Sequence, residues 1–213
     1  MGRRKINDYE RGSEALAGLH SLLSYGDNLH YEKFADGSVK CIEDEIPFDL
    51  PEGWAWVRLV SLIEAFITGP FGSALHKSDY VADGIPLINP MNITNGKVIP
   101  IDKMQVSPET AERLSSFKVA PSDIVIARRG DMGRCAVVQP AQKGWLCGTG
   151  SFILRFPAVL CSEYFAVCLR SPYSVELMLV VPTMDNRHHA QPSGSANGIS
   201  SSMHFTLPSA NFS

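Results

Sequence analysis

Three arginines on one short segment are the residues of this chain that most clearly indicate a chemical role. Arg128, Arg129 and Arg134 lie between two apolar runs, and Gly130 and Gly133 interrupt the segment. Glycine favours a tight turn because it takes a positive φ angle without steric cost. Guanidinium groups match phosphate oxygens and the O6/N7 edge of guanine. The segment is therefore either a basic β-turn that contacts nucleic acid or a solvated turn of an ordinary domain.

A glycine-rich loop over residues 69–80 is a second candidate. Its backbone N–H groups, together with Ser73, His76 and Lys77, could hold a phosphate group. The glycine-lysine-serine ending of a nucleotide-binding P-loop is absent. The alternative interpretation is a packing loop with Phe71 in the core.

Side-chain amides and a third loop add further candidates. Asn89, Asn92 and Asn95 could read adenine through two hydrogen bonds each, or could simply form turns. Thr149 lies in the glycine-rich segment 145–150, which we expect near the same edge of the domain. Cys147 shares that segment, so a cysteine-dependent enzyme is a competing interpretation. It would need a nearby base and a lowered thiol pKa.

Composition limits the classes of protein that remain. The 213 residues are 45% hydrophobic, so a substantial core can form, and the net charge of −3 does not by itself indicate a nucleic-acid binder. Basic residues concentrate between 118 and 155, and acidic residues between 43 and 52, so only the first region could face phosphates. We expect no cofactor.

The cysteines and apolar runs indicate a cytoplasmic protein. Five cysteines at irregular spacing, without a CxxC pair, are typical of reduced thiols and predict no structural metal. Charges and Pro172 interrupt the most apolar region, residues 160–181, so we expect no membrane span. The N-terminus does not resemble a signal peptide.

Alternating and helical periodicities predict the elements that position these residues. Leucine spacing predicts a helix within 8–24, followed by a polar linker over 25–49. Asn95-Gly96 predicts a hairpin turn. Ser107 with Pro108 predicts a helix start, and we expect that helix to end near Phe117. We further expect strands over 54–58, 85–89, 123–127, 134–139 and 151–156, a helix or strand over 60–67, and helices over 162–169 and 171–181.

Several of these segments resemble one family in both residues and order. Glu45–Leu59 looks like the opening of a target recognition domain from the specificity (S) subunit of prokaryotic type I restriction-modification systems. The resemblance covers roughly residues 28–186. The segments that follow in the family's order are Gly69–Ser73, Gly84–Asn89, Asp123–Gly130, Gly133–Val137 and the helix start at Ser171-Pro172.

The resemblance implies an α+β recognition domain with a twisted, mostly antiparallel sheet and a few helices. Such a subunit recognises duplex DNA and has no catalytic site of its own, because methyltransferase (M) subunits and a motor-nuclease (R) subunit carry the chemistry. A recognition module of another type of restriction enzyme is the other family-level alternative. The residues that we expect at the DNA are Arg128, Arg129, Arg134, Lys77, His76, Ser73, Asn89, Asn92 and Thr149.

The chain departs from the family plan at its C-terminal region. We expect an N-terminal helix and linker over 1–44, one recognition domain over 45–182, and an atypical tail over 183–213, without the family's long spacer helix or second recognition domain. The tail is rich in small and polar residues and lacks periodicity. A frameshift near Asn186 would explain it. We expect such a tail to pack loosely or to associate, like the N-terminal helix, with another copy.

Overall fold

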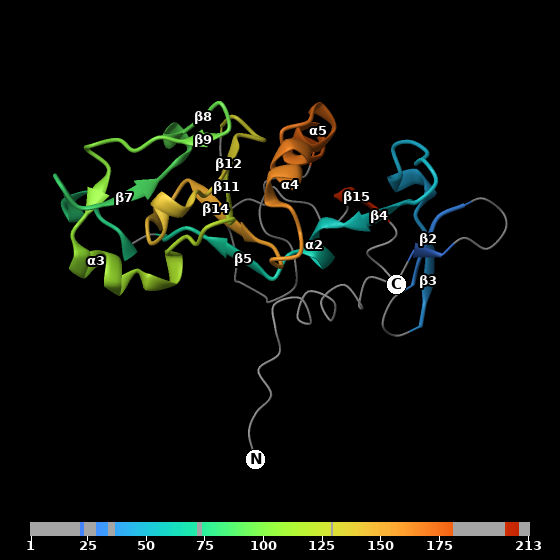
Figure 1. Ribbon diagram of the computed structural model, residues 1–213, viewed down its shortest axis with the longest axis horizontal. Coiled ribbons are helices and arrows are strands. Elements are labelled where there is room, and N and C mark those ends of the chain that lie inside the picture. The colour runs from blue at the N-terminus through green and yellow to red at the C-terminus, as the bar shows by residue number, and fades with distance from the viewer. Residues whose placement is uncertain are drawn as a thin grey trace, which may run out of the picture. The chain divides into compact units, whose positions relative to one another are not determined.

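The computed structural model describes residues 22–23, 29–33, 37–71, 74–128, 130–180 and 203–208. The chain divides into two compact units: residues 1–62, 157–160 and 201–213 form the first, and residues 63–156 and 161–200 form the second. Small, mostly antiparallel sheets and short helices build both (Figure 1), which confirms the predicted α+β class. Residues 45–62, which we expected to open the recognition domain, group with the first unit.

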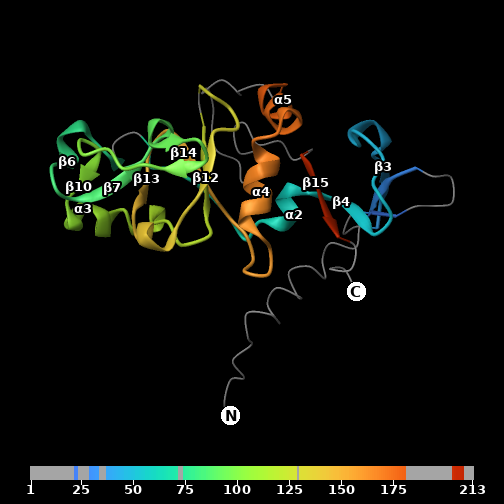
Figure 2. The same ribbon diagram turned by 45° about the horizontal axis from the view of Figure 1, so that its top comes forward.

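The first unit contains two small sheets. Strands β1 (Leu22–Leu23), β2 (Tyr31–Lys33) and β3 (Val39–Cys41) form an antiparallel sheet, and the 3-10 helix η1 (Glu43–Glu45) follows it. Strand β4 (Trp54–Arg58) has the predicted bounds and leads into the short helix α2 (Leu59–Leu62). Strand β15 (His204–Pro208) pairs with β4 in antiparallel register, as Figure 2 shows.

Three expectations for the first unit were wrong. Met203, Phe205 and Leu207 are buried, at 1%, 3% and 4% exposure, so this part of the tail packs firmly. Leu22–Leu23 form a strand instead of the end of a helix, and residues 8–21 of that expected helix lie outside the described residues. The expected linker over 25–49 likewise contains β2 and β3. Strands of three residues are too short to show hydrophobic periodicity, and the side chains of β3 are exposed.

The central sheet of the second unit has four antiparallel strands in the order β12-β11-β14-β5. These are β5 (Ala65–Thr68), β11 (Ile124–Ala127), β12 (Cys135–Val137) and β14 (Ser151–Arg155). Every residue of β11 is buried, since neighbouring strands cover both of its edges. The bounds of β11, β12 and β14 were predicted to within two residues. The apolar run over 60–67, for which we expected a helix or a strand, contains the strand β5.

A second four-stranded sheet has the order β13-β7-β10-β6. Strand β13 (Leu146–Cys147) runs parallel to β7 (Ile85–Ile88), and β10 (Gln105–Val106) pairs antiparallel with β7 and with β6 (Tyr80–Val81). Strands β8 (Ile93–Thr94) and β9 (Lys97–Val98) form the hairpin that Asn95-Gly96 predicted, with φ angles of 50° and 72° at these two residues. Short 3-10 helices interrupt the loops: η3 (Lys77–Asp79), η4 (Pro90–Asn92), η5 (Ser115–Phe117) and η6 (Pro140–Gln142).

Helices of the second unit begin where the sequence predicted. Helix α3 (Pro108–Arg113) starts at Ser107, whose Oγ accepts the N–H of Thr110 at 3.1 Å. It ends earlier than expected because the chain tightens into η5. Helix α4 (Ser162–Leu169) packs on β12, and α5 (Pro172–Val180) follows directly. Across the described residues, no helix has the length and apolar character that a membrane crossing requires.

Candidate functional site

Strand register brings four loops to one end of the sheets in the second unit. Ala127 pairs with Ser151 and Thr68 pairs with Phe152, so the loops after β5, after β11 and before β14 all leave the same end. Cys147 pairs with Ile88 in parallel, so the loops that follow β13 and β7 also run together. We call this region the loop end: residues 69–71, 89–92, 128 and 130–134, and 148–150.

Glycines allow the loops of the loop end to approach one another closely. A Cβ atom on Gly69 would lie 1.9 Å from the carbonyl oxygen of Gly148, and one on Gly148 would lie 2.2 Å from Asn89 Oδ1. The N–H of Gly69 donates to the carbonyl of Ser151 at 3.1 Å. The N–H of Gly150 donates to Asn89 Oδ1 at 3.4 Å. Three loops from distant parts of the sequence are therefore fixed against one another.

Arg128 does not project from the turn as we expected. Its exposure is 9%, and its guanidinium carbon lies 4.1 Å from the centroid of the Phe71 ring and 5.7 Å from that of Phe152. Its backbone N–H donates to Gly150 at 2.8 Å. The interpretation of Phe71 as a core residue was wrong, because this side chain is 49% exposed.

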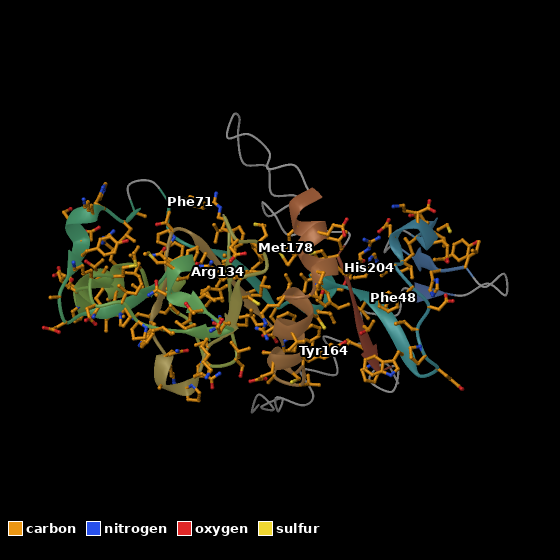
Figure 3. The ribbon with its side chains drawn as sticks, turned by 90° about the horizontal axis from the view of Figure 1, so that it is seen from above. Phe48, Phe71, Arg134, Tyr164, Met178 and His204 are labelled. Carbon is orange, nitrogen blue, oxygen red and sulfur yellow. The ribbon has the colours of Figure 1, made fainter. Side chains whose placement is uncertain are left out.

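Arg134 connects two of the loops. Its Nε and Nη2 donate to Asp131 Oδ2 at 3.1 and 2.7 Å, and its Nη1 donates to the carbonyl of Pro90 at 3.3 Å. The Arg134 side chain remains 38% exposed and that of Asp131 68% exposed. Figure 3 labels Arg134 and Phe71 among the side chains of the second unit. Asp131 thus orients an arginine that stays accessible to solvent.

A pocket of about 570 Å³ adjoins Arg134 and brings in a second arginine. Arg170 lies just after α4, and its Nη1 donates to the carbonyl of Cys135 at 3.5 Å. Gly133, with φ +80°, fixes the pocket wall, since a Cβ there would lie 2.4 Å from Val175 Cγ2 on α5. Sequence reasoning missed Arg170 because 36 positions separate it from Arg134 and no motif connects them. The lining comprises residues 93–96, 131–135, Arg170, Pro172 and Val175.

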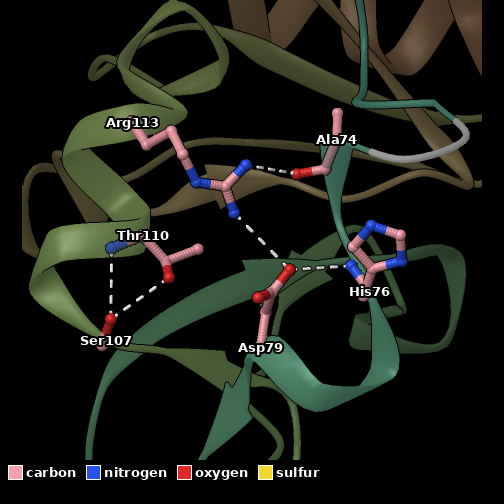
Figure 4. A network of polar contacts seen from close by, with 6 residues as sticks. All are labelled: Ala74, His76, Asp79, Ser107, Thr110 and Arg113. Carbon is pink, nitrogen blue, oxygen red and sulfur yellow. Dashed lines mark hydrogen bonds and ion pairs between the residues drawn. The ribbon is translucent and has the colours of Figure 1, made fainter.

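His76 and Lys77 lie away from the loop end. Tyr80 pairs with Val106, which pairs with Ile85 at the start of β7, whereas the loop end follows the finish of β7. Both side chains are exposed. Figure 4 shows what fixes their segment: Asp79 Oδ2 accepts the N–H of His76 at 2.7 Å and lies 3.5 Å from Arg113 Nη2, while Arg113 Nη1 donates to the carbonyl of Ala74 at 2.8 Å.

The remaining predicted residues divide into structural and accessible ones. Asn92 is 1% exposed; its Oδ1 accepts the N–H of Asn89 and its Nδ2 donates to Ile99, both at 3.0 Å, so its amide builds the turn. Asn89 is half-buried and Thr149 is exposed. Ser73 and Arg129 lie outside the described residues.

The opposite end of the central sheet is closed by an ion pair. Arg155 Nε and Nη2 donate to the two carboxylate oxygens of Asp123, each at 2.7 Å, and Asp123 is 2% exposed. Asp123 Oδ2 also accepts the N–H of Ala120 at 2.7 Å. The hydrogen bond to Asp123 raises the pKa of the Arg155 guanidinium. This pair is a structural element of the sheet.

Cys147 lacks the properties of a nucleophile. Burial, together with the negative charge of Asp123, raises the pKa of its thiol to about 12. A reactive thiol has a lowered pKa and some exposure, whereas Cys147 is fully buried. Among the residues that the structure describes, no group of three or more His, Cys, Asp or Glu side chains is arranged to hold a metal ion.

The second unit is thus a rigid α+β scaffold that presents loops from one end, an arrangement typical of a binding domain. The chain is 29% identical, over 85 residues, to the Type I restriction enzyme EcoAI specificity subunit of Escherichia coli, a match that covers 40% of this chain and 14% of that protein. The resemblance inferred from the motifs is therefore confirmed, over a small part of the relative's length. No protein-family model matches the chain.

One solved structure supports the α+β fold of the chain, with a TM-score just above 0.5. A chain from a study of complex assembly and conformational transition of the type I R-M system has a TM-score of 0.51 and 22% identity, with 76% of this chain and 36% of that chain covered. The HsdS subunit from Thermoanaerobacter tengcongensis has a TM-score of 0.42 and 21% identity, with 76% and 33% covered. The chain spans about a third of the length of each of these proteins.

Proposed function

We propose that this chain recognises a sequence in duplex DNA, as the specificity component of a type I restriction-modification complex. The observation that carries the proposal is the loop end, where close glycine contacts hold separate loops together beside an arginine-lined pocket. A rigid constellation of loops is suited to reading a base sequence, because little order has to be gained on binding. The sequence similarity to a specificity subunit supports the same conclusion.

In this proposal the exposed arginines contact the phosphates. Arg134 and Arg170 line one pocket, and Asp131 offsets part of their charge without covering Arg134. Guanidinium groups bind phosphate through charge-assisted hydrogen bonds, which position a protein on DNA but carry no sequence information. Arg129 and Ser73 belong by sequence to loops of the same region and join this set, and Lys77 with His76 would contact the backbone further along the duplex.

In this proposal side chains of the loop end contact the bases. Thr149 is exposed and carries a hydroxyl that suits base edges. Asn89 is half-buried and its Oδ1 already accepts the N–H of Gly150, so it would contribute only its Nδ2 as a donor. Arg128 is placed to support the surface from below, because it is nearly buried. Asn92 contributes indirectly, by fixing the turn that carries Asn89.

The partners follow from the same proposal. The chain would supply DNA recognition to methyltransferase and motor-nuclease subunits in the prokaryotic cytoplasm, and those subunits would modify and cleave the DNA. Methylation by the reconstituted complex reports this role directly. Co-expression with the methyltransferase subunit from the same gene cluster should give methylated sites that share one sequence, read by methylation-sensitive sequencing.

The DNA contact itself is tested by salt dependence. The Kd of the purified chain for a fluorescent duplex of random sequence should lie at about 10⁻⁴ to 10⁻⁶ M, and R134A/R170A should reduce the slope of log K against log salt by about 1.8. Lysine in place of alanine at position 134, in R134K/R170A, should restore part of the slope, because lysine keeps the positive charge. K143A is the matched control: Lys143 is exposed and precedes β13, whereas the loop end follows this strand. Equal slopes for R134A/R170A and the unaltered chain would contradict the proposal.

A further inference from the structure

Phe71 is an aromatic side chain held at the loop end with half of its surface in solvent. Its exposure is 49%, although a phenyl ring normally gains by burial. The adjacent Pro70 restricts the backbone, the carbonyl of Phe71 accepts the N–H of Ala74 at 3.1 Å, and Gly69 is fixed to Ser151. The ring is therefore exposed and at the same time rigidly placed.

The Arg128 guanidinium supports the ring from inside the domain. Its carbon lies 4.1 Å from the centroid of the Phe71 ring, within the range of a cation–π contact, and 5.7 Å from that of Phe152. Arg128 is 9% exposed and its backbone is bonded to Gly150. One face of the Phe71 ring is consequently covered by a fixed cation, and the rest of the exposed ring is directed outward.

This arrangement limits what the ring can do on DNA. Partial insertion between two stacked bases costs a few kcal/mol of unstacking, and the cation holds the Phe71 ring against the domain by one of its faces. A phenyl group has no hydrogen-bonding atom, so it can read only apolar features of a base edge. Thymine is the base that presents an apolar group, its C5-methyl, in the major groove.

We propose that Phe71 reads a thymine methyl group, and that Arg128 is a positioning residue that acts through the ring. The inference rests on the proposed DNA-recognition function and adds an apolar, specificity-determining contact to its polar ones. Arg128, which the sequence placed among the residues at the DNA, then contributes to base choice without touching the DNA.

The test uses a duplex pool with a randomised centre, selected by binding to the purified chain at low salt and sequenced. The unaltered chain should enrich thymine at one position. Replacement of that thymine by uracil, which removes only the methyl group, should weaken binding about fourfold, as expected for one buried methyl-sized group. F71A should lose the enrichment at that position alone and become insensitive to uracil, while F71Y, which keeps an aromatic ring on the Arg128 guanidinium, should retain it.

Arg128 has its own readout in the same selection. R128A should reproduce the loss of thymine preference with an unchanged salt slope, whereas a phosphate contact would reduce that slope by about 0.9. F48A is the control, because Phe48 is also an exposed phenylalanine, at 57%, but belongs to the first unit. Melting curves confirm that each variant is folded.

Each remaining outcome has a defined meaning. Enrichment by the unaltered chain that persists in F71A, or that is indifferent to uracil, overturns the inference and leaves the proposed function intact. An even loss of preference at all positions in folded F71A also overturns it, because the ring would then only support the loops. Failure of the unaltered chain, both alone and with methyltransferase subunits, to select any sequence overturns the proposed function itself.

Discussion

The two ends of the central sheet carry the same pair of side chains in opposite settings. At the closed end, Arg155 and Asp123 form two parallel hydrogen bonds around a carboxylate that is 2% exposed. At the loop end, Arg134 directs two nitrogens to a single oxygen of Asp131, whose side chain is 68% exposed. The two arginines are similarly exposed, at 34% and 38%, so the difference lies in the carboxylates. The buried Asp123 makes the first pair a structural contact, and the exposed Asp131 leaves the second accessible to a ligand.

The largest effect on stability should come from breaking the ion pair between Asp123 and Arg155. Asp123→Asn keeps the shape of the side chain but removes the buried charge that accepts two hydrogen bonds from Arg155. Because the Arg155 side chain is itself 34% exposed, we expect a loss of about 1.5–3 kcal/mol, the range for hydrogen bonds to a charged group. Urea denaturation followed by circular dichroism measures this loss. A change below about 1 kcal/mol would show that the closed end behaves like a surface pair.

Steric disruption of the loop end should have the next largest effect. Gly69→Ala places a Cβ 1.9 Å from the backbone oxygen of Gly148, so the loops must separate. We expect a loss of about 1–3 kcal/mol, as for other overpacked sites, together with weaker DNA binding. Gly130→Ala is the control: its Cβ would meet nothing within 4 Å, and only its φ of +79° is unfavourable, which costs about 1 kcal/mol. Equal effects of the two substitutions would contradict the close packing of the loops.

Buried thiols near the two sheets should make stability depend on pH in the alkaline range. Burial raises the pKa of Cys147 to about 12 and that of Cys135 to about 11, from 9.0. Above pH 9 the unfolded chain loses thiol protons that the folded chain retains, so stability is full below pH 9 and falls as pH rises from there. Each thiol contributes a slope of up to about 1.4 kcal/mol per pH unit.

The matched variant for this prediction is Cys147→Ala. Its stability, measured by urea denaturation at pH 8, 9 and 10, should fall less steeply than that of the unaltered chain. The difference between the two slopes isolates Cys147 from other groups that titrate in the same range. Identical slopes would indicate that the thiol is not buried.

The smallest effect on stability should come from the exposed pair. Asp131→Ala should change the free energy of unfolding by less than about 1 kcal/mol, because both side chains are solvated. It should nevertheless tighten low-salt DNA binding, since it removes a negative charge from the arginine pocket. Fluorescence anisotropy at several salt concentrations separates the two effects, and a large loss of stability would contradict the comparison on which the prediction rests.

Local signals in the sequence predicted the elements of the second unit well. Ser107, Asn95 and Gly96 specify caps and turns through their own backbone and side-chain chemistry, so the helix start and hairpin appear as predicted. Strand β11 was visible because its residues are apolar and a turn follows. The orientation of Arg128 was not visible, because it depends on Phe71, which only the fold brings to it.

The site was therefore predicted in part. The sequence identified the loops that converge, but it could not separate Asn92, which is buried by its own turn, from Asn89, nor place Lys77 at the other end of β7. Arg170 depends on the packing of α4 against β12. Met203, Phe205 and Leu207 do alternate, as in a strand, but their polar surroundings hid a pattern of only three apolar residues.

The pairing of β15 with β4 has a consequence for the order in which the molecule forms. His204 pairs with Arg58, and the whole of the second unit lies between them in the sequence. At a synthesis rate of about 5–20 residues per second, β4 leaves the ribosome roughly 7 to 30 seconds before its partner exists. During that interval the hydrogen-bonding edge of β4 that later pairs with β15 has no partner strand. The second unit can fold while the first still waits for its final strand.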